Sequence, residues 1–378
     1  MRHSGFFARQ LCAAGLLAVI AMHAAVAAPW LDASSACTEW IAMGEPMRAL
    51  IYRSDPLAAR NDRITRAIVI VHGGSRDANV NFTHVLAAAF LAGALEDTVI
   101  VSPRFASNEE NVALDGGGNS VAAARSAARD SLAPNELNWI SVFGGRHWNA
   151  GGVAVNAKVT SYEVIDEILR RLAVKGVFPN LKSIVVAGHS SGGQFVGRYQ
   201  MVNRVHEGLG VKVTYLVSNP GAYTYLDNLR PTASAIPSNV SSAVSGFIPL
   251  GTTKPAPPFV PYADARNCTT YDAWPYGLNG RVGYSAAATG EQLKQQIISR
   301  PTTFLLGELD ILPLVNFDIS CAAMAQGSSR LARGLAFGRY VRENYAAQHK
   351  TVVVEGCGHN TRCMLTADAA LPLLFPRD

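Results

Sequence analysis

The stretch Ser183-Ile-Val-Val-Ala-Gly-His-Ser-Ser-Gly192 passes from an apolar, β-branched run into a serine placed between two glycines. The apolar run predicts a buried strand, and residues 193–205 predict a helix directly after it. A turn this tight crowds the side chains around its centre, and glycine on both sides of Ser190 relieves that crowding. In a strand–turn–helix setting, the Gly-x-Ser-x-Gly pattern is typical of a nucleophilic serine that projects above a sheet. Ser190 is therefore the candidate nucleophile.

Apolar runs like the one that begins this stretch recur along the chain. Runs without polar alternation indicate strands buried on both faces, as in a parallel sheet. They occupy residues 67–72, 97–102, 212–218, 302–306 and 350–354. Helical periodicity covers residues 161–174, with Ser161 as the predicted N-cap, and part of 322–346. Strands that alternate with helices predict an α/β fold, in which helices cover both faces of the sheet.

Residues 221–301 interrupt this alternation. They are rich in proline and tyrosine, lack clear periodicity and offer no second set of strands. We interpret them as a cap-like insertion after the sixth strand, within a single domain that covers residues 28–378. A linker between two domains is the alternative, and the aromatic content of the segment argues against it.

The bulk composition restricts the classes of partner. A hydrophobic content of 49% in 378 residues is enough for a large core, and 16% of charged residues argues against long disordered charged tracts. The net charge is +5, but the lysines and arginines are scattered. Nucleic-acid binding requires basic residues that are focused on one face, so we expect no nucleic-acid partner.

The first 27 residues have the pattern of a signal peptide. Arg2, His3 and Arg9 give a basic start, residues 11–26 are apolar, and Ala25-Val26-Ala27 supplies the small side chains that cleavage requires. A retained membrane anchor is the alternative, but the run is short for a span and ends in small residues. We expect export to a secreted or periplasmic location, with no stable membrane span after cleavage.

Five cysteines follow the predicted signal peptide, and an oxidising compartment favours their pairing. We predict one bridge between Cys357 and Cys363, which are six residues apart, and a second between Cys268 and Cys321. Cys37 is then left over. Sequence alone does not fix this connectivity. Metal ligation is less favoured because the chain has no Cys-x-x-Cys pair, and we expect neither a metal nor a cofactor.

A serine hydroxyl is a weak nucleophile until a base removes its proton. His359, in the loop after the last predicted strand, is the candidate base. Asp310, at the end of the preceding predicted strand, is the candidate carboxylate that orients the imidazole. Glu308 and Asp318 are alternatives. We favour Asp310 because a loop residue after that strand reaches the histidine.

The tetrahedral intermediate of acyl transfer needs hydrogen-bond donors for its oxyanion. The loop His72-Gly-Gly-Ser75 follows the first predicted strand, and the backbone N–H groups of Gly74 and Ser75 are candidate donors. The N–H of Ser191, the residue after the nucleophile, is the candidate second donor.

These residues together make the chain resemble the α/β-hydrolase superfamily. The resemblance rests on the early His72-Gly73-Gly74 loop and on the chain order Ser190, Asp310, His359. It covers most of the chain after the predicted signal peptide. It implies a mostly parallel eight-stranded sheet and acyl transfer through an acyl-serine. Ser75 stands where the His-Gly-Gly-Gly loop has its third glycine, so the hormone-sensitive-lipase-like branch is not assigned.

The expected function is hydrolysis of a carboxylic ester, small or polymeric, by an exported serine hydrolase. A peptidase or amidase with the same triad is one alternative. A non-catalytic binding protein that kept the fold is another, and the complete set of three residues argues against it. In the glycine-rich stretch 139–152, His147 and Trp148 are candidate pocket residues. A packed surface loop is an equally good interpretation of that stretch.

Overall fold

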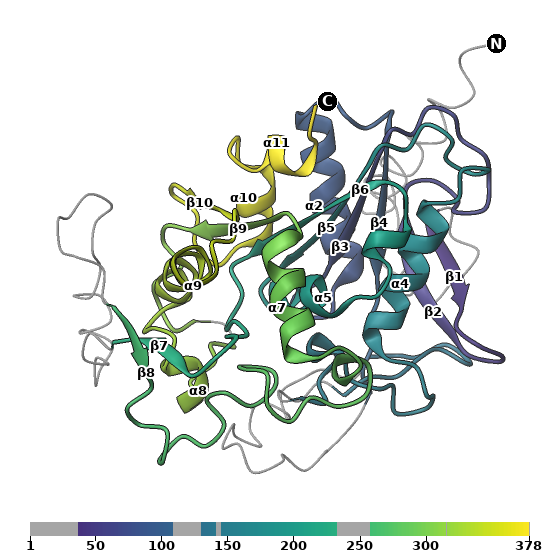
Figure 1. Cartoon of the computed structure of the whole chain (residues 1–378). Helices are drawn as coiled ribbons and strands as arrows, with labels where there is room; N and C mark the ends of the chain where they lie inside the picture. The colour runs from purple at the N-terminus through teal and green to yellow at the C-terminus, as the bar shows by residue number, and fades with distance from the viewer. Residues whose placement is uncertain (1–36, 109–129, 141–144, 233–257, 315, 378) are drawn as a thin grey trace.

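The computed structural model describes residues 37–108, 130–140, 145–232, 258–314 and 316–377 (Figure 1). The predicted signal peptide, residues 1–27, lies outside the described residues. Within the described part of the chain, no helix is both long and apolar enough to cross a membrane.

An eight-stranded sheet forms the centre of the molecule. Its strands are β1 (Thr38–Ala42), β2 (Arg48–Arg53), β3 (Arg66–Val71), β4 (Thr98–Pro103), β5 (Ser183–His189), β6 (Lys212–Ser218), β9 (Thr302–Gly307) and β10 (Lys350–Val354). Their order across the sheet is β1-β2-β4-β3-β5-β6-β9-β10. The pairs from β4 to β10 are parallel, and β1 and β2 form an antiparallel edge. The structure thus confirms the expected mostly parallel sheet of an α/β fold.

Side chains alternate between the two faces of the sheet, and each face carries its own apolar core. Ile68 and Ile70 of β3 face one core, and Val69 and Val71 face the other. The first core is closed by α2 (Ala78–Leu91), α10 (Thr361–Thr366) and α11 (Leu371–Leu374). The second is closed by α4 (Ser161–Leu172), α5 (Ser191–Val202), α7 (Gly290–Ser299) and α9 (Arg330–Tyr345). Figure 1 shows these two groups of helices on opposite sides of the strands.

Two local predictions need correction. The N-cap of α4 is Thr160, not Ser161, because the Thr160 side chain and that of Glu163 form a reciprocal capping box. Residues 221–301 do contain strands, since β7 (Leu229–Pro231) pairs with β8 (Phe259–Pro261) in a separate two-stranded sheet. Strands of three residues that contain proline give no readable period, which is why the sequence analysis missed them.

The remaining short elements lie in the connections of the fold. They are the single turns η2 (Trp148–Ala150), η3 (His206–Gly208) and η4 (Gly283–Ala286) and the helix α8 (Cys321–Met324). The elements β7, β8, η4 and α7 all lie between β6 and β9. An excursion therefore follows the sixth strand of the main sheet, as expected. Residues 233–257 of that excursion lie outside the described residues.

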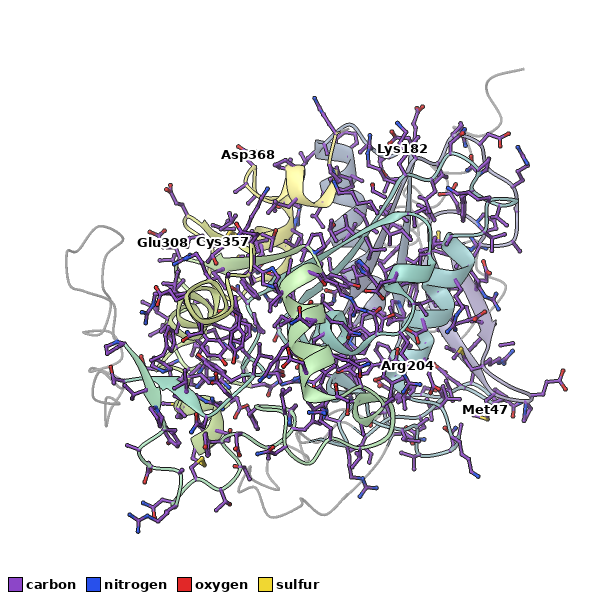
Figure 2. The ribbon with its side chains drawn as sticks, viewed as in Figure 1. Met47, Lys182, Arg204, Glu308, Cys357 and Asp368 are labelled. Carbon is purple, nitrogen blue, oxygen red and sulfur yellow. A yellow bond between two sulfur atoms is a disulfide. The ribbon has the colours of Figure 1, made fainter. Side chains whose placement is uncertain are left out.

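The predicted disulfides Cys268–Cys321 and Cys357–Cys363 are both present. The second closes the loop after β10, where Figure 2 labels Cys357 next to Glu308. Cys37 is also disulfide-bonded, which corrects the expectation that it is left over.

Candidate active site

Ser190 lies at the carboxyl edge of the sheet, between β5 and α5. Its backbone has φ 59° and ψ −121°, a strained conformation for a residue with a side chain. The Ser190 N–H donates to the carbonyl oxygen of Ser218 at 3.0 Å, which fixes the turn against the end of β6. Ser190 is the N-cap residue of α5, yet its side chain does not cap the helix. The hydroxyl is therefore free to face another partner.

The glycines around Ser190 are required by close backbone contacts. A Cβ on Gly188 would collide with the carbonyl of Gly192, and a Cβ on Gly192 would collide with the carbonyl of Val71. A Cβ on Gly193 would collide with the carbonyl of Ser218. Helix α5 therefore begins in direct backbone contact with the ends of β3 and β6, as the glycine pattern predicted for the turn.

His359 and Asp310 come together with Ser190 at this edge. His359 Nε2 lies 2.9 Å from Ser190 Oγ, and His359 Nδ1 lies 2.7 Å from Asp310 Oδ2. The Asp310 side chain is 1% exposed and that of His359 is 9% exposed. Because a carboxylate only accepts hydrogen bonds, Nδ1 carries the imidazole proton and Nε2 accepts from the Ser190 hydroxyl.

The two alternatives to Asp310 have other partners. Glu308 accepts a hydrogen bond from the N–H of Gly356 at 2.9 Å, within the loop after β10. Asp318 accepts from the hydroxyl of Tyr276 at 2.7 Å and from the N–H of Ser320 at 3.0 Å. The structure thus brings Asp310, rather than either competitor, to His359.

Asn219, the residue after β6, joins the ends of three strands. Its Oδ1 accepts from the N–H of Gly307 at 2.7 Å, and its Nδ2 donates to the carbonyl of Gly358 at 3.2 Å. Its φ of 43° is in the left-handed region, which asparagine tolerates better than most residues. Asn219 therefore fixes the His359 loop against the end of β9.

His189, the last residue of β5, packs against the candidate base. The His189 and His359 ring centroids are 4.7 Å apart, and His189 Nδ1 lies 3.0 Å from the hydroxyl of Thr361. Burial, together with the neighbouring His359 and Arg330, lowers the pKa of His189 well below its ordinary value. His189 is therefore neutral beside His359.

The loop after β3 borders the nucleophile, as the sequence analysis expected. A Cβ on Gly73 would lie 3.6 Å from the Ser190 Cβ, and one on Gly74 would lie 3.4 Å from Ser191 Oγ. In the described part of the chain, the N–H groups of Gly74, Ser75 and Ser191 have no hydrogen-bond acceptor. These three donors remain available for a ligand at this edge.

His72 holds this loop from inside. It is fully buried, and its Nε2 accepts a hydrogen bond from the N–H of Phe105 at 3.0 Å. Its Nδ1 therefore carries the proton and donates to the carbonyl of Gly73 at 2.8 Å. Burial lowers the pKa of His72 to about 4, which keeps the ring neutral at physiological pH. This hydrogen bond fixes the peptide unit that carries the Gly74 N–H.

The structure places His147 and Trp148 in the interior rather than in an open pocket. They are 2% and 1% exposed. The Trp148 ring stacks on Phe105 at 5.3 Å and lies 4.7 Å from the ring of His72. The alternative interpretation, a packed loop, therefore describes this stretch better. Tryptophan has a large apolar surface, and burial of this surface explains why Trp148 lies in the core.

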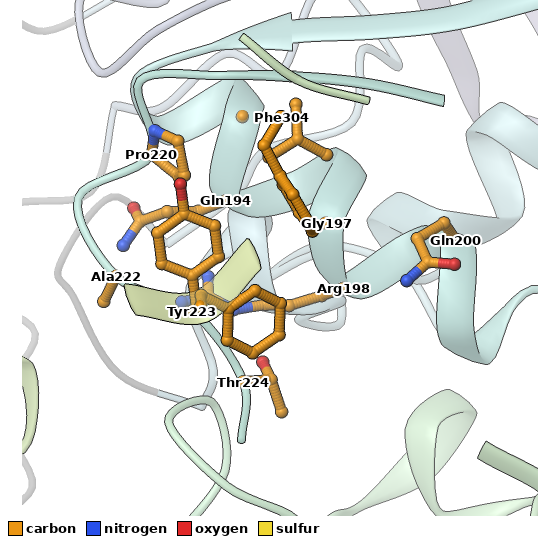
Figure 3. A pocket seen from close by; sticks show the side chains of 12 residues that line it. Gln194, Gly197, Arg198, Gln200, Pro220, Ala222, Tyr223, Thr224 and Phe304 are labelled. Carbon is orange, nitrogen blue, oxygen red and sulfur yellow. The ribbon is translucent and has the colours of Figure 1, made fainter. Parts of the chain in front are cut away.

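A small cavity is lined by residues of α5 and of the chain that follows β6 (Figure 3). Its volume of about 10 Å³ is close to the smallest space that holds one water molecule. The side chains of Arg198, Tyr223 and Phe304 are among those that line it. Neither His359 nor Asp310 lines it, so this cavity is not the substrate site.

The sequence analysis missed several groups that support the site. Asn219 directly follows a predicted strand, and His189 is the last residue of β5 and the neighbour of Ser190, so their positions were the signal that could have identified them. Arg330, which contacts Asp310, is an ordinary residue of a helical stretch, and no sequence pattern distinguishes it.

Comparisons with known proteins bear on the fold. No family model matches the chain, and no curated protein matches its sequence. Among solved structures, LpqC, a poly(3-hydroxybutyrate) depolymerase from Bordetella parapertussis, is similar with a TM-score of 0.52 and 18% identity. That match covers 87% of this chain and 84% of the depolymerase. Poly(aspartic acid) hydrolase-1 from Sphingomonas sp. KT-1 is similar with a TM-score of 0.51 and 17% identity, over 89% of this chain and 97% of the hydrolase.

Identities this low establish a shared fold and nothing about the reaction. The order of the strands, the tight turn at Ser190 and the position of the three side chains at the carboxyl edge agree with that fold. The chain therefore has an α/β-hydrolase fold.

Proposed function

We propose that this protein is an exported serine hydrolase that cleaves carboxylic esters through an acyl-serine intermediate. The observation that carries the proposal is the continuous set of hydrogen bonds from Ser190 through His359 to Asp310, at 2.9 Å and 2.7 Å. The strained backbone of Ser190 is a second support, since such strain concentrates at functional sites.

Acylation begins when the Ser190 oxygen attacks the ester carbonyl. His359 Nε2 takes the hydroxyl proton, and the imidazolium that forms is stabilised by the carboxylate of Asp310. The tetrahedral intermediate then collapses, and the imidazolium gives its proton to the departing alcohol. This leaves the acyl group on Ser190 and a neutral His359.

Deacylation repeats these steps with water in place of the serine. His359 takes a proton from the water, whose oxygen attacks the acyl carbonyl. The second intermediate releases the carboxylic acid and returns the proton to Ser190. In both steps we expect the oxyanion to accept hydrogen bonds from the candidate donors, which are the backbone N–H groups of Gly74, Ser75 and Ser191.

Exposed aliphatic side chains follow the end of β9 and favour a substrate with apolar parts. Leu309, Leu314 and Ile319 are 50%, 58% and 69% exposed. The two acidic residues in the same stretch, Asp310 and Asp318, are buried. The aromatic residues of the excursion after β6 supply little of this surface. Most of them are buried in the cores, namely Tyr223, Tyr225, Trp274, Tyr276 and Tyr284.

Export is supported by the predicted signal peptide and by the disulfides. Disulfides form and persist in oxidising compartments. Detection of the mature protein in the periplasm or medium, with an N-terminus at Ala28, tests this part of the proposal.

The catalytic role is tested with Ser190→Ala and its neighbour Ser191→Ala. We expect Ser190→Ala to lower kcat on a p-nitrophenyl ester by at least about 10³-fold. Ser191→Ala keeps the backbone N–H and is the matched control, so its kcat stays within a few-fold of wild type. A fluorophosphonate probe should label wild type and Ser191→Ala but not Ser190→Ala. Wild-type turnover by Ser190→Ala would end the proposal.

Ester and amide substrates are then compared on the same enzyme. The two similar structures are named for a polyester and for poly(aspartic acid), so both bond types belong in the assay. We expect kcat/KM for an aliphatic p-nitrophenyl ester to exceed that of the matching anilide. The opposite order would replace the proposed esterase with an amidase that uses the same triad.

A further inference from the structure

Arg330, the first residue of α9, contacts the carboxylate that orients the candidate base. Its guanidinium nitrogen NH1 lies 3.3 Å from Asp310 Oδ1, and both side chains are 1% exposed. His359 uses the other carboxylate oxygen, Oδ2. The two oxygens of Asp310 are therefore held by different partners on opposite sides of the group.

The same guanidinium also holds the chain that follows Asp310. NH1 donates to the carbonyl of Leu314 at 3.0 Å, and the guanidinium carbon lies 5.2 Å from the centre of the Phe317 ring. The backbone N–H of Leu331 donates to the carbonyl of Asp310 at 3.2 Å. The start of α9 thus fixes both the backbone and the side chain of Asp310.

We propose that Arg330 is a positioning residue, which holds Asp310 in the orientation that presents Oδ2 to His359. The proposal rests on the proposed function, because it assigns Asp310 its role in that mechanism. The terminal torsion of an aspartate is broad, so a carboxylate with one partner rotates over a wide range. A second partner on Oδ1 limits this rotation and offsets the desolvation of a buried charge.

The charged groups near His359 determine how the removal of Arg330 affects the protonation of this base. His359 is faced by Ser190, Asp310 and the neutral ring of His189. Burial lowers the pKa of Arg330 and Asp310 opposes that shift, but an arginine stays charged in proteins. Without this cation, the negative charge of Asp310 stabilises the imidazolium of His359 more strongly. The base then stays protonated to a higher pH.

Arg333, one turn further along α9, provides a matched control. It is fully buried like Arg330, but it donates to the carbonyls of Gly221, Gly327 and Asp318. Among the described residues, it forms no hydrogen bond or ion pair with Asp310 or His359. Replacing either arginine removes a buried cation, and only Arg330 touches the triad.

The test compares Arg330→Met, Arg330→Lys and Arg333→Met with the full-length wild type. For Arg330→Met we expect kcat on a p-nitrophenyl ester to fall at least tenfold. We also expect the acidic limb of kcat/KM to move to higher pH. Arg330→Lys restores the charge without the planar fork, so the limb returns towards wild type while kcat recovers in part. Arg333→Met lowers the thermal midpoint but leaves the limb in place.

A proton NMR measurement on the same proteins is independent of turnover. The downfield resonance of the His359 Nδ1 proton reports the hydrogen bond to Asp310. We expect it to shift or broaden in Arg330→Met and to stay unchanged in Arg333→Met. Arg330→Lys folds more readily if the methionine variant does not, and it must then show a lower kcat than wild type.

Three results would overturn the proposal. They are wild-type kcat and pH limb in Arg330→Met, an equal movement of the limb in Arg333→Met, and an unchanged NMR signal in a folded Arg330→Met protein. Failure of the proposed function is distinguishable from these results. In that case wild type itself shows no turnover and its Ser190 is not labelled by a fluorophosphonate, whereas the NMR signal still reports on Arg330.

Discussion

Two of the disulfides, Cys268–Cys321 and Cys357–Cys363, close loops of very different length, which leads to a prediction about stability and activity. Cys268 and Cys321 are 53 residues apart, whereas Cys357 and Cys363 are 6 apart. In the chain-entropy model, a bridge stabilises the native state by restricting the unfolded chain, and longer loops gain more. That model gives about 4 kcal/mol for the long loop and about 2 kcal/mol for the short one.

The loss of kcat should follow the opposite order, with the larger loss on removal of the short-loop bridge. The short loop encloses His359, so removing the Cys357–Cys363 bridge loosens the base. We expect the Cys357→Ala/Cys363→Ala variant to lose at least about fivefold in kcat. The Cys268→Ala/Cys321→Ala variant keeps kcat within about twofold, since neither cysteine contacts the triad.

The assay measures the free energy of unfolding in urea and kcat on one ester for both double variants. Each variant is the control for the other, because both remove two sulfur atoms and one bridge. A larger loss of stability from the short loop than from the long one would refute the entropy argument. Equal losses of kcat in the two variants would refute the role given to the short loop.

Two further predictions concern the elbow and the acid stability. Gly192→Ala should lower kcat more than tenfold and destabilise the fold by about 1–3 kcal/mol, because the added Cβ collides with the Val71 carbonyl. Thermal unfolding followed by circular dichroism measures the stability, and ester turnover measures kcat. A variant with the stability and kcat of wild type would contradict this prediction. Burial lowers the pKa of His349 to about 4, so the unfolded chain binds a proton between pH 6.5 and 4 that the folded chain does not. Stability is therefore lost as pH falls through this window, by up to about 3 kcal/mol and less where solvent screens the ring. His349→Phe should flatten this decline in urea unfolding at pH 7.5 and 4.5, and an unchanged slope would contradict the assignment.

The central strands and the nucleophile turn were readable from the sequence. The runs that became β3, β5 and β6 are buried on both faces, so they are apolar throughout and carry a strong signal. The strands β1 and β2 were missed. In β1, buried and exposed positions mix over only five residues, and in β2 only four buried residues lie between Arg48 and Arg53. Their existence followed from the resemblance to the superfamily and not from their own pattern.

Support around the triad depends on contacts between distant parts of the chain. Arg330 meets Asp310 only because α9 packs back against the end of β9. Trp148 was predicted to line a pocket because it lies in a glycine-rich stretch, but its side chain packs in the core. Sequence periodicity reports burial along one element, and it does not report which elements meet.

The contact between His189 and His359 determines where a proton rests during the proposed turnover. Each of the two imidazoles has a nitrogen that can accept a proton. If His189 competed with His359 for the proton of Ser190, the Ser190 hydroxyl would have no single base. Because His189 stays neutral, the proton that leaves Ser190 binds only to His359 Nε2. His359 then donates this proton to the departing alcohol.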